Sequence, residues 1–285
     1  MTGLLAEISS RAVNAFAVAS MAAVGLRYSI HEILRPLRSA AGVALVLGAN
    51  FVAVPLLAIG ILQIVPLDRP YAIGLVLVAL AAGAPFTIKL TQMSGGDVAF
   101  SAGVLVLLIV LSIGVVPLVA PRLAPGVTIS AWGIAAPLIR TMLLPLVLGM
   151  GVRAFASRAT PALLRLLGPI ANVALAVLVL LIFGRNVTAV AGMFGTGAIA
   201  ASVLLIAGAF AIGWVSGGLG ERLNDEVGFC TAQRNYAAAL VVASDAFASP
   251  DIVLMVVVVS LISMAMLFPA ARFLNRWLAG PRIPA

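Results

Sequence analysis

Charged side chains are scarce in this sequence. Only 9% of its 285 residues are Asp, Glu, Lys or Arg, whereas 63% are hydrophobic. A soluble domain carries roughly 25% charged residues, which cover the outer faces of its helices. The composition therefore argues against a soluble protein. Several apolar runs also reach the roughly 20 residues that a helix needs to cross a bilayer.

Cysteine and histidine are almost absent. The single cysteine, Cys230, cannot form an internal disulfide, and with the one histidine, His31, it does not make a metal centre. The sequence also lacks a His-Glu-x-x-His motif, a Gly-x-Ser-x-Gly motif and a phosphate loop. We therefore expect neither an enzyme nor a bound cofactor. The first residues lack a basic segment before an apolar core, so we expect no cleaved signal peptide.

Basic residues outnumber acidic ones, and the net charge is +8. The arginines are scattered singly between apolar runs without a dense basic stripe, so nucleic acid is not an expected partner. Cytoplasmic loops retain excess positive charge, and an excess on one side predicts a cell-membrane protein with its N-terminus outside and its C-terminus in the cytoplasm. The predicted cytoplasmic side collects Arg27, Arg35, Arg38, Arg153, Arg158, Arg165, Arg222, Arg272, Arg276 and Arg282, and the other side collects Arg11, Arg69, Arg122 and Arg185.

The apolar runs predict an all-α membrane protein with about nine transmembrane helices in one polytopic domain, residues 1–285. A short amphipathic link, residues 31–38, is expected between the first two spans. The expected spans cover about 13–28, 40–64, 71–94, 98–119, 129–152, 164–183, 190–215, 224–243 and 252–273.

Two of these spans carry signals of an interruption. Pro85 interrupts the third span, because proline lacks an N–H and clashes with the preceding turn. In the eighth span the polar residues Gln233, Arg234 and Asn235, together with Gly228, favour a break. Such a break frees backbone groups, which are tolerated in a membrane only when they are buried in protein or line a cavity.

The two halves of the chain, about 1–125 and 126–285, repeat the same landmarks in the same order. Gly96-Asp97 opens the fourth span, and Pro250-Asp251 opens the ninth. In each half the interrupted helix comes directly before that span. Matched elements are five spans apart and so cross the bilayer in opposite senses. This order predicts an inverted repeat, with a binding site near the midplane where the broken helices cross.

Three basic residues are expected at membrane depth, namely Lys89, Arg140 and Arg234. Ionisable residues inside a membrane are functional by default. Each also has a plainer explanation. Lys89 could extend to the interface, Arg234 could form an ion pair or cap free carbonyls at a helix end, and Arg140 could bind a carbonyl.

Several uncharged residues are further candidates. Asn50 and Asn172 lie within spans, where an asparagine either bridges helices or contacts a substrate. Gln233 and Asn235 flank Arg234 directly. Asp97 is expected to cap the N-terminus of the fourth span.

These residues resemble the bile acid:sodium symporter family over nearly the whole chain. The resemblance rests on Val54-Pro55-Leu56-Leu57-Ala58, on Gly96-Asp97-Val98-Ala99-Phe100-Ser101 and on Asn235-x-x-x-Ala-Leu. It implies a core domain with two crossed, interrupted helices and a panel domain that moves against it. It also implies transport of organic anions into the cytoplasm with two sodium ions.

The resemblance implies sodium ligands as well, and most of them are missing in the first half of the chain. With Gly96-Asp97 as the anchor, the serine-asparagine pair of the family falls on Thr87 and Ile88. The serine of the next helix is kept as Ser101, but the threonine one turn later is Leu105. Isoleucine and leucine side chains offer none of the hard oxygen ligands that sodium prefers.

Sodium ligands are also missing in the second half of the chain. With Asn235 as the anchor, the glutamate of the family falls on Cys230 and its glutamine on Arg234. A shifted register would instead give Glu226 the carboxylate role. As the sequence stands, a lysine lies beside the first lost site and an arginine occupies the second.

We therefore expect a transporter of a small organic anion in which Lys89 and Arg234 replace the bound sodium ions. Transport would be driven by the substrate gradient or by protons, since a desolvated Lys89 could release a proton whereas Arg234 stays charged. Two alternatives stay open, a conventional sodium-coupled symporter and a membrane receptor that does not transport.

Overall fold

The computed structural model describes residues 2–29, 31, 39–123, 131–219, 223–247 and 249–278. Within these ranges every regular element is helical and no strand occurs. Five helical segments are long and apolar enough to cross a membrane, and they are Ala40–Ile64, Phe100–Pro121, Ala131–Phe155, Ala198–Leu219 and Pro250–Asn275. The expected all-α membrane protein is therefore confirmed, while the number of nine spans stays a prediction.

The helices follow the expected order along the chain. In the first half they are α1 (Thr2–Arg27), α3 (Ala40–Gly48), a π-helical turn (Ala49–Ala53), α4 (Val54–Ile64), α5 (Arg69–Leu80), α6 (Phe86–Ser94) and α7 (Val98–Leu123). In the second half they are α8 (Ala131–Leu138), a π-helical turn (Ile139–Leu143), α9 (Leu144–Phe155), a 3-10 turn (Ser157–Ala159), α10 (Thr160–Gly192), α11 (Ala198–Leu219), α12 (Asn224–Ala232), α13 (Tyr236–Val241), a π-helical turn (Val242–Ala246) and α14 (Pro250–Leu278).

Some boundaries differ from the prediction. Helix α10 continues to Gly192 and α11 begins at Ala198, so the expected end near residue 183 and the expected start of the next span near residue 190 are both wrong. One glycine, here Gly184, weakens a helix by only about 1 kcal/mol and does not end it. The chain turns instead before α11, where Gly197 has a φ of 80°. The link at 32–38 and the start of the fifth span at 129–130 lie outside the described residues.

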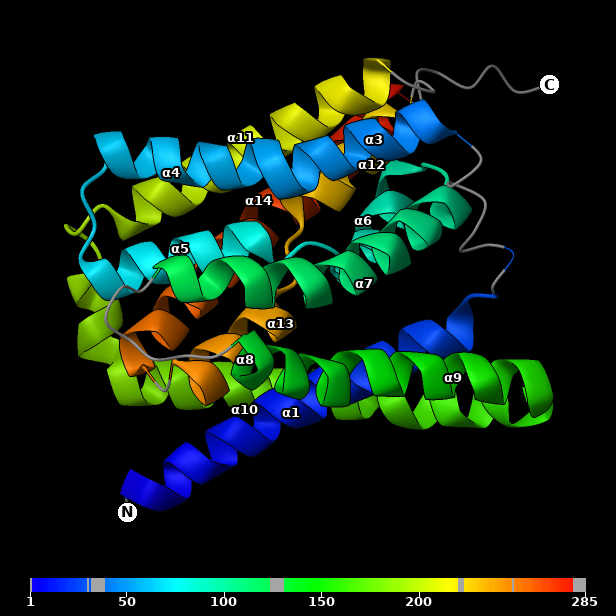
Figure 1. The fold of residues 1–285 in the computed structure, drawn as a ribbon, viewed down its shortest axis with the longest axis horizontal. Helices are drawn as coiled ribbons and strands as arrows, with labels where there is room; N and C mark the ends of the chain where they lie inside the picture. Colours follow the sequence, from blue (N-terminus) through cyan, green and yellow to red (C-terminus); the bar gives the residue numbers. More distant parts are fainter. Residues whose placement is uncertain are drawn as a thin grey trace.

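All helices but α8 fall into two packed groups, and α8 contacts α7 and the turn before α9. Helix α1 contacts α9 and α10, and these three lie together along the lower side of Figure 1. We call them the panel unit. The core unit consists of α3–α7 and α11–α14, in which α11 packs against α12 and α4, and α14 packs against α5 and α6. This arrangement agrees with the core and panel that the family resemblance implies.

Two glycines let α1 and α9 approach closely. A Cβ atom at Gly25 would lie 2.1 Å from the backbone oxygen of Leu146, and a Cβ atom at Gly149 would lie 2.5 Å from that of Ala22. Small residues at a crossing allow such contact between membrane helices, where dispersion replaces the hydrophobic effect as the driving force. The panel unit therefore depends on glycine at both positions.

This crossing predicts opposite effects for two nearby substitutions on α9. We expect Gly149→Ala to lower stability by about 1–3 kcal/mol, because the added methyl meets backbone that cannot move independently. Gly151→Ala is the matched control, because a Cβ atom there has no neighbour within 4 Å. Alanine also favours helix by up to about 1 kcal/mol over glycine. Thermal unfolding in detergent measures both, and equal melting temperatures would contradict the close crossing.

Candidate functional site

The two interrupted helices meet at their breaks. The third span stops at Leu80 and resumes at Phe86, and the eighth stops at Ala232 and resumes at Tyr236. The backbone N–H of Asn235 donates to the oxygen of Ala81 at 2.7 Å, which ties one break to the other. The two interruptions predicted from the sequence therefore exist, and they cross.

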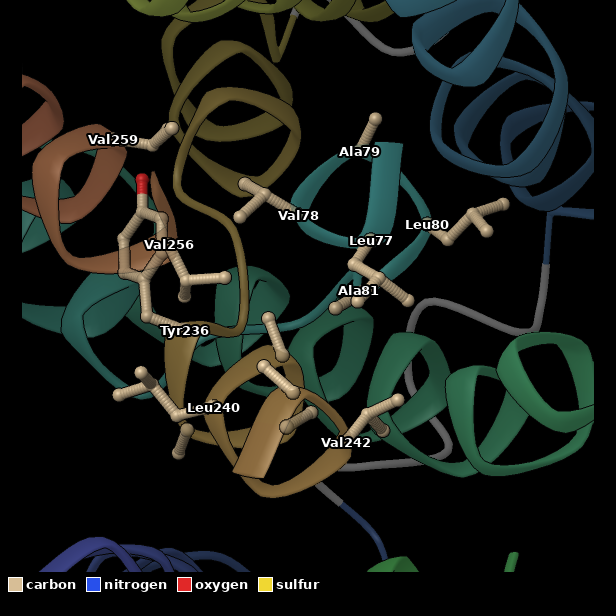
Figure 2. Close-up of a cluster of buried hydrophobic side chains, with 14 of the residues drawn as sticks. Leu77, Val78, Ala79, Leu80, Ala81, Tyr236, Leu240, Val242, Val256 and Val259 are labelled. Atoms are coloured by element: carbon tan, nitrogen blue, oxygen red, sulfur yellow. The ribbon is translucent and has the colours of Figure 1, made fainter. Parts of the chain in front are cut away.

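Apolar packing encloses this crossing. Figure 2 shows Val78 from the end of α5 close to Val256 of α14 and Tyr236 of α13, with Leu77 and Leu240 in the same cluster. All five side chains are buried. Polar backbone groups at the breaks therefore have to find partners within the protein.

The local causes of the two breaks differ. Pro85 precedes the first residue of α6, as predicted. In the eighth span Gly228 lies inside α12 and not at the break, so its assigned role is wrong. A Cβ atom there would lie 3.1 Å from the ring of Phe210, which explains a small residue by packing. The break falls at Gln233–Asn235, and the Asn235 side chain accepts from Ala238 N–H at 3.1 Å to cap α13.

Arg234 fills the crossing and is completely buried. Its Nε donates to the oxygen of Val78 at 3.3 Å, its Nη2 donates to that of Ala79, and its Nη1 donates to that of Thr231 at 3.0 Å. These carbonyls belong to the last turns of α5 and α12, where a helix has no donors of its own. The guanidinium thus caps the C-terminal ends of both half-helices, which are the negative ends of their dipoles.

Asn50 supplies the remaining two acceptors for Arg234. Nη1 donates to Asn50 Oδ1 at 2.7 Å, and Nη2 donates to Asn50 O at 3.3 Å. This backbone oxygen lies in the π-helical turn, where Val54 N–H donates to Ala49 O and Pro55 has no N–H to offer. A guanidinium has five N–H donors, and all five of them are engaged.

Arg234 therefore caps free carbonyls, which is one of the explanations left open by the sequence. The described residues hold one salt bridge, Arg11–Glu7, and Arg234 takes no part in it. The charge at the crossing is balanced by backbone dipoles and an amide and not by a carboxylate.

Lys89 lies in a different setting. It is exposed on α6 and lines a cavity of about 220 Å³ between the core unit and the panel unit. Asn172 of α10 lines the same cavity. Lys89 is therefore open to this cavity in the present conformation, whereas Arg234 is enclosed. A second, smaller hollow of about 20 Å³ is lined by Arg234 and Asn235.

The two hollows adjoin. Phe16, Pro85 and Phe86 line both of them, so the same short wall separates the cavity of Lys89 from the hollow at the crossing. Lys89 and Arg234 thus flank one region, although one is exposed and the other buried. The third cation expected at membrane depth, Arg140, is exposed in the turn between α8 and α9 and lines neither hollow.

The positions implied as sodium ligands are mostly apolar and buried. Ile88, Leu105 and Cys230 are each at most 4% exposed. Ser101 Oγ lies 2.9 Å from Thr91 Oγ1. Thr87 is buried, and its hydroxyl has no hydrogen-bond partner in the described part of the chain. Within that part no group of three or more His, Cys, Asp or Glu side chains could hold a metal ion.

Two side-chain amides near the crossing keep free donors. Gln233 Oε1 accepts from Ser263 Oγ at 3.1 Å. The Nδ2 of Asn235 and the Nε2 of Gln233 are buried and have no acceptor among the described residues. Buried donors without acceptors are rare, so these groups are available to a ligand or to water.

Glu226 has a structural partner away from the crossing. It is 8% exposed in the first turn of α12, and its Oε1 accepts from the backbone N–H of Asp97 at 2.7 Å. Asp97 in turn accepts from Phe100 N–H at 3.0 Å, which confirms it as the N-cap of α7. Glu226 therefore supports the start of α7 together with Asp97.

Sequence reasoning missed several residues of the site. The hydroxyls of Thr91 and Thr231 and the cation Arg27, which lines the cavity of Lys89, were not singled out. Thr91 lies one helical turn after Thr87, and this spacing is a signal that could have found it. Arg27 had been assigned only to the membrane boundary.

Comparison with known families identifies the family to which the chain belongs. The family described as the Sodium Bile acid symporter family matches residues 16–193. The chain belongs to this family. The match includes the first interrupted helix with Lys89, while the second, with Arg234, lies beyond it. No curated protein matches the chain. Membership identifies a multi-pass membrane protein of a transporter family.

The cap predicts a large effect for Arg234→Met, which keeps the bulk and removes every donor. Several buried carbonyls would be left unpaired at roughly 1–3 kcal/mol each, so we expect a loss of more than about 3 kcal/mol. In thermal unfolding this corresponds to about 6 °C or more. Arg140→Met is the matched control and should change stability by no more than about 0.5 kcal/mol. Equal melting temperatures for the two variants would contradict the cap.

Proposed function

We propose that the protein carries a small organic anion across the cell membrane by alternating access without binding sodium, and that Arg234 and Lys89 take the place of the bound ions. Family membership supports an organic-anion transporter. The observation that carries the sodium-independent part is the engagement of all five Arg234 donors by carbonyl oxygens at the helix crossing.

The positive charge of Arg234 offsets the negative ends of two helices. The C-terminal end of a helix carries about −0.5 elementary charge, and α5 and α12 both end at the crossing. One guanidinium carries a full positive charge and balances two such ends. A sodium ion about 4 Å away would be repelled by roughly 4 kcal/mol at an effective dielectric of 20. Arg234 thus removes both the oxygen ligands and the negative potential that a sodium ion would need.

Substrate contacts in this proposal fall on groups with free donors. Lys89 faces the cavity between the units, and Asn235 and Gln233 keep amide donors near the crossing. Thr87 offers a free hydroxyl on the first turn of α6. Ser101, Cys230 and Asn50 would act by shaping the site, because Ser101 and Asn50 are hydrogen-bonded within the protein and Cys230 is packed. Movement of the panel against the core would then change access to these groups.

The proposed orientation keeps the N-terminus outside and the C-terminus in the cytoplasm. Arg153 of α9 donates to the backbone oxygens of Leu26 and Arg27, so the C-terminal ends of α1 and α9 lie together. Both ends carry arginines assigned to the cytoplasmic side, which supports the count. The arginines at 35, 38, 222 and 282 lie outside the described residues.

The first functional prediction concerns sodium. We expect uptake into proteoliposomes of organic anions such as carboxylates to survive the replacement of sodium by choline, because the charges at the crossing are already balanced. The measurement compares initial uptake rates in the two salts at equal ionic strength. A strict requirement for sodium would favour the conventional symporter, in which Thr91, Ser101 and Glu226 would supply the oxygen ligands.

A second prediction concerns a variant that restores two of the residue types that the family resemblance implies as sodium ligands. In Cys230→Glu combined with Arg234→Gln, a carboxylate and an amide stand where the family resemblance implies sodium ligands. We expect sodium, but not choline, to raise the melting temperature of this double variant, since a ligand that binds only the folded state stabilises it. The wild type should show no such difference. A folded double variant that ignores sodium would remove the support for ion replacement by Arg234.

A further inference from the structure

The cavity between the panel and core units carries two positive charges. Lys89 lines it from α6, and Arg27 lines it from the last turn of α1. No acidic residue occurs among the described residues that line it. Polar neutral groups such as Gln92 and Asn172 complete the lining next to the aromatic rings of Phe16 and Phe86.

Neither cation is neutralised within the described part of the chain. The salt bridge recorded there joins Arg11 to Glu7, and it involves neither Arg27 nor Lys89. Arg234 differs from both, because its N–H groups already donate to oxygens at the helix crossing. Two like charges on one cavity with low-dielectric walls concentrate a positive potential inside it. A ligand with a single negative group leaves one of these charges unmatched.

The cavity is also small. Its volume of about 220 Å³ is below the roughly 300–1,000 Å³ of pockets that enclose drug-sized ligands. A steroid acid is a ligand of drug size and would not be enclosed in this conformation. An organic acid of a few carbon atoms fits the volume and leaves room for its hydration.

From charge and size together, we infer that the substrate is a compact dianion, a short-chain dicarboxylate, held by Lys89 at one end and by Arg27 at the other. This inference rests on the proposed transport function and specifies its substrate class. Arg27 belongs to the panel unit and Lys89 to the core unit, so a dianion bridges the two parts and a monoanion of the same size does not. The second carboxylate therefore contributes to closing the panel onto the core.

The test uses the purified full chain in choline buffer, with thermal shift to measure binding and proteoliposomes to measure uptake. The probes are dicarboxylates of three to six carbons, each paired with its half-amide of equal size, and taurocholate as a bulky monoanion. We expect the best dicarboxylate to bind about tenfold or more tightly than its half-amide, the value of one charge-assisted contact. Arg27→Gln and Lys89→Gln should each abolish this preference, and Arg27→Lys should retain it.

Arg165→Gln is the matched control, because Arg165 is an exposed arginine of α10 that does not line the cavity. It should keep the full preference. Equal or tighter binding of a half-amide or of taurocholate would overturn the inference, and sodium-free uptake of that monoanion would leave the proposed function standing. A preference that persists in both glutamine variants would also overturn it. Absence of binding and uptake for every anion would remove the proposed function as well.

Discussion

Backbone carbonyls without helical donors are the constraint on which this structure depends. Two spans are interrupted and a third contains a π-helical turn, and the interruptions release backbone oxygens in segments that are buried in the protein. In hydrocarbon an unpaired backbone group costs several kcal/mol. One side chain from the second break, Arg234, donates to a freed oxygen of each of the three segments, at Val78, Thr231 and Asn50. The crossing is thereby fixed from within.

The choice of arginine follows from the geometry of that task. Five acceptors surround a single group, and only the planar guanidinium presents five donors in a fixed fork. A lysine would carry the same charge with three donors on a flexible stem. Burying a guanidinium is itself unfavourable, so the charge is retained only because helix dipoles and the Asn50 amide replace its hydration. Charge and hydrogen bonding are thus satisfied by the same contacts.

The sequence predicted features that depend on one segment of backbone better than features that depend on how distant segments pack. Pro85 and the polar triplet at 233–235 located both breaks, because they act on their own segments of backbone. The partnership between Arg234 and Asn50 joins residues 184 positions apart, and no periodicity encodes it. Whether a membrane cation is buried or faces a cavity was equally hidden, since it depends on the neighbouring helices. Lys89 and Arg234 looked alike in the sequence and differ completely in exposure.

This difference in exposure distinguishes two tasks, the capping of freed carbonyls and the recognition of a substrate, which the sequence suggested equally for both residues. A charge that neutralises freed carbonyls has no donor left for a ligand, and Arg234 is in this position. A charge that recognises a substrate has to remain exposed and unpaired, as Lys89 is within the described part of the chain. The hollows of the two residues share a wall formed by Pro85 and Phe86, at the start of α6. The first residues of α6 therefore belong to the surroundings of both the exposed cation and the buried one.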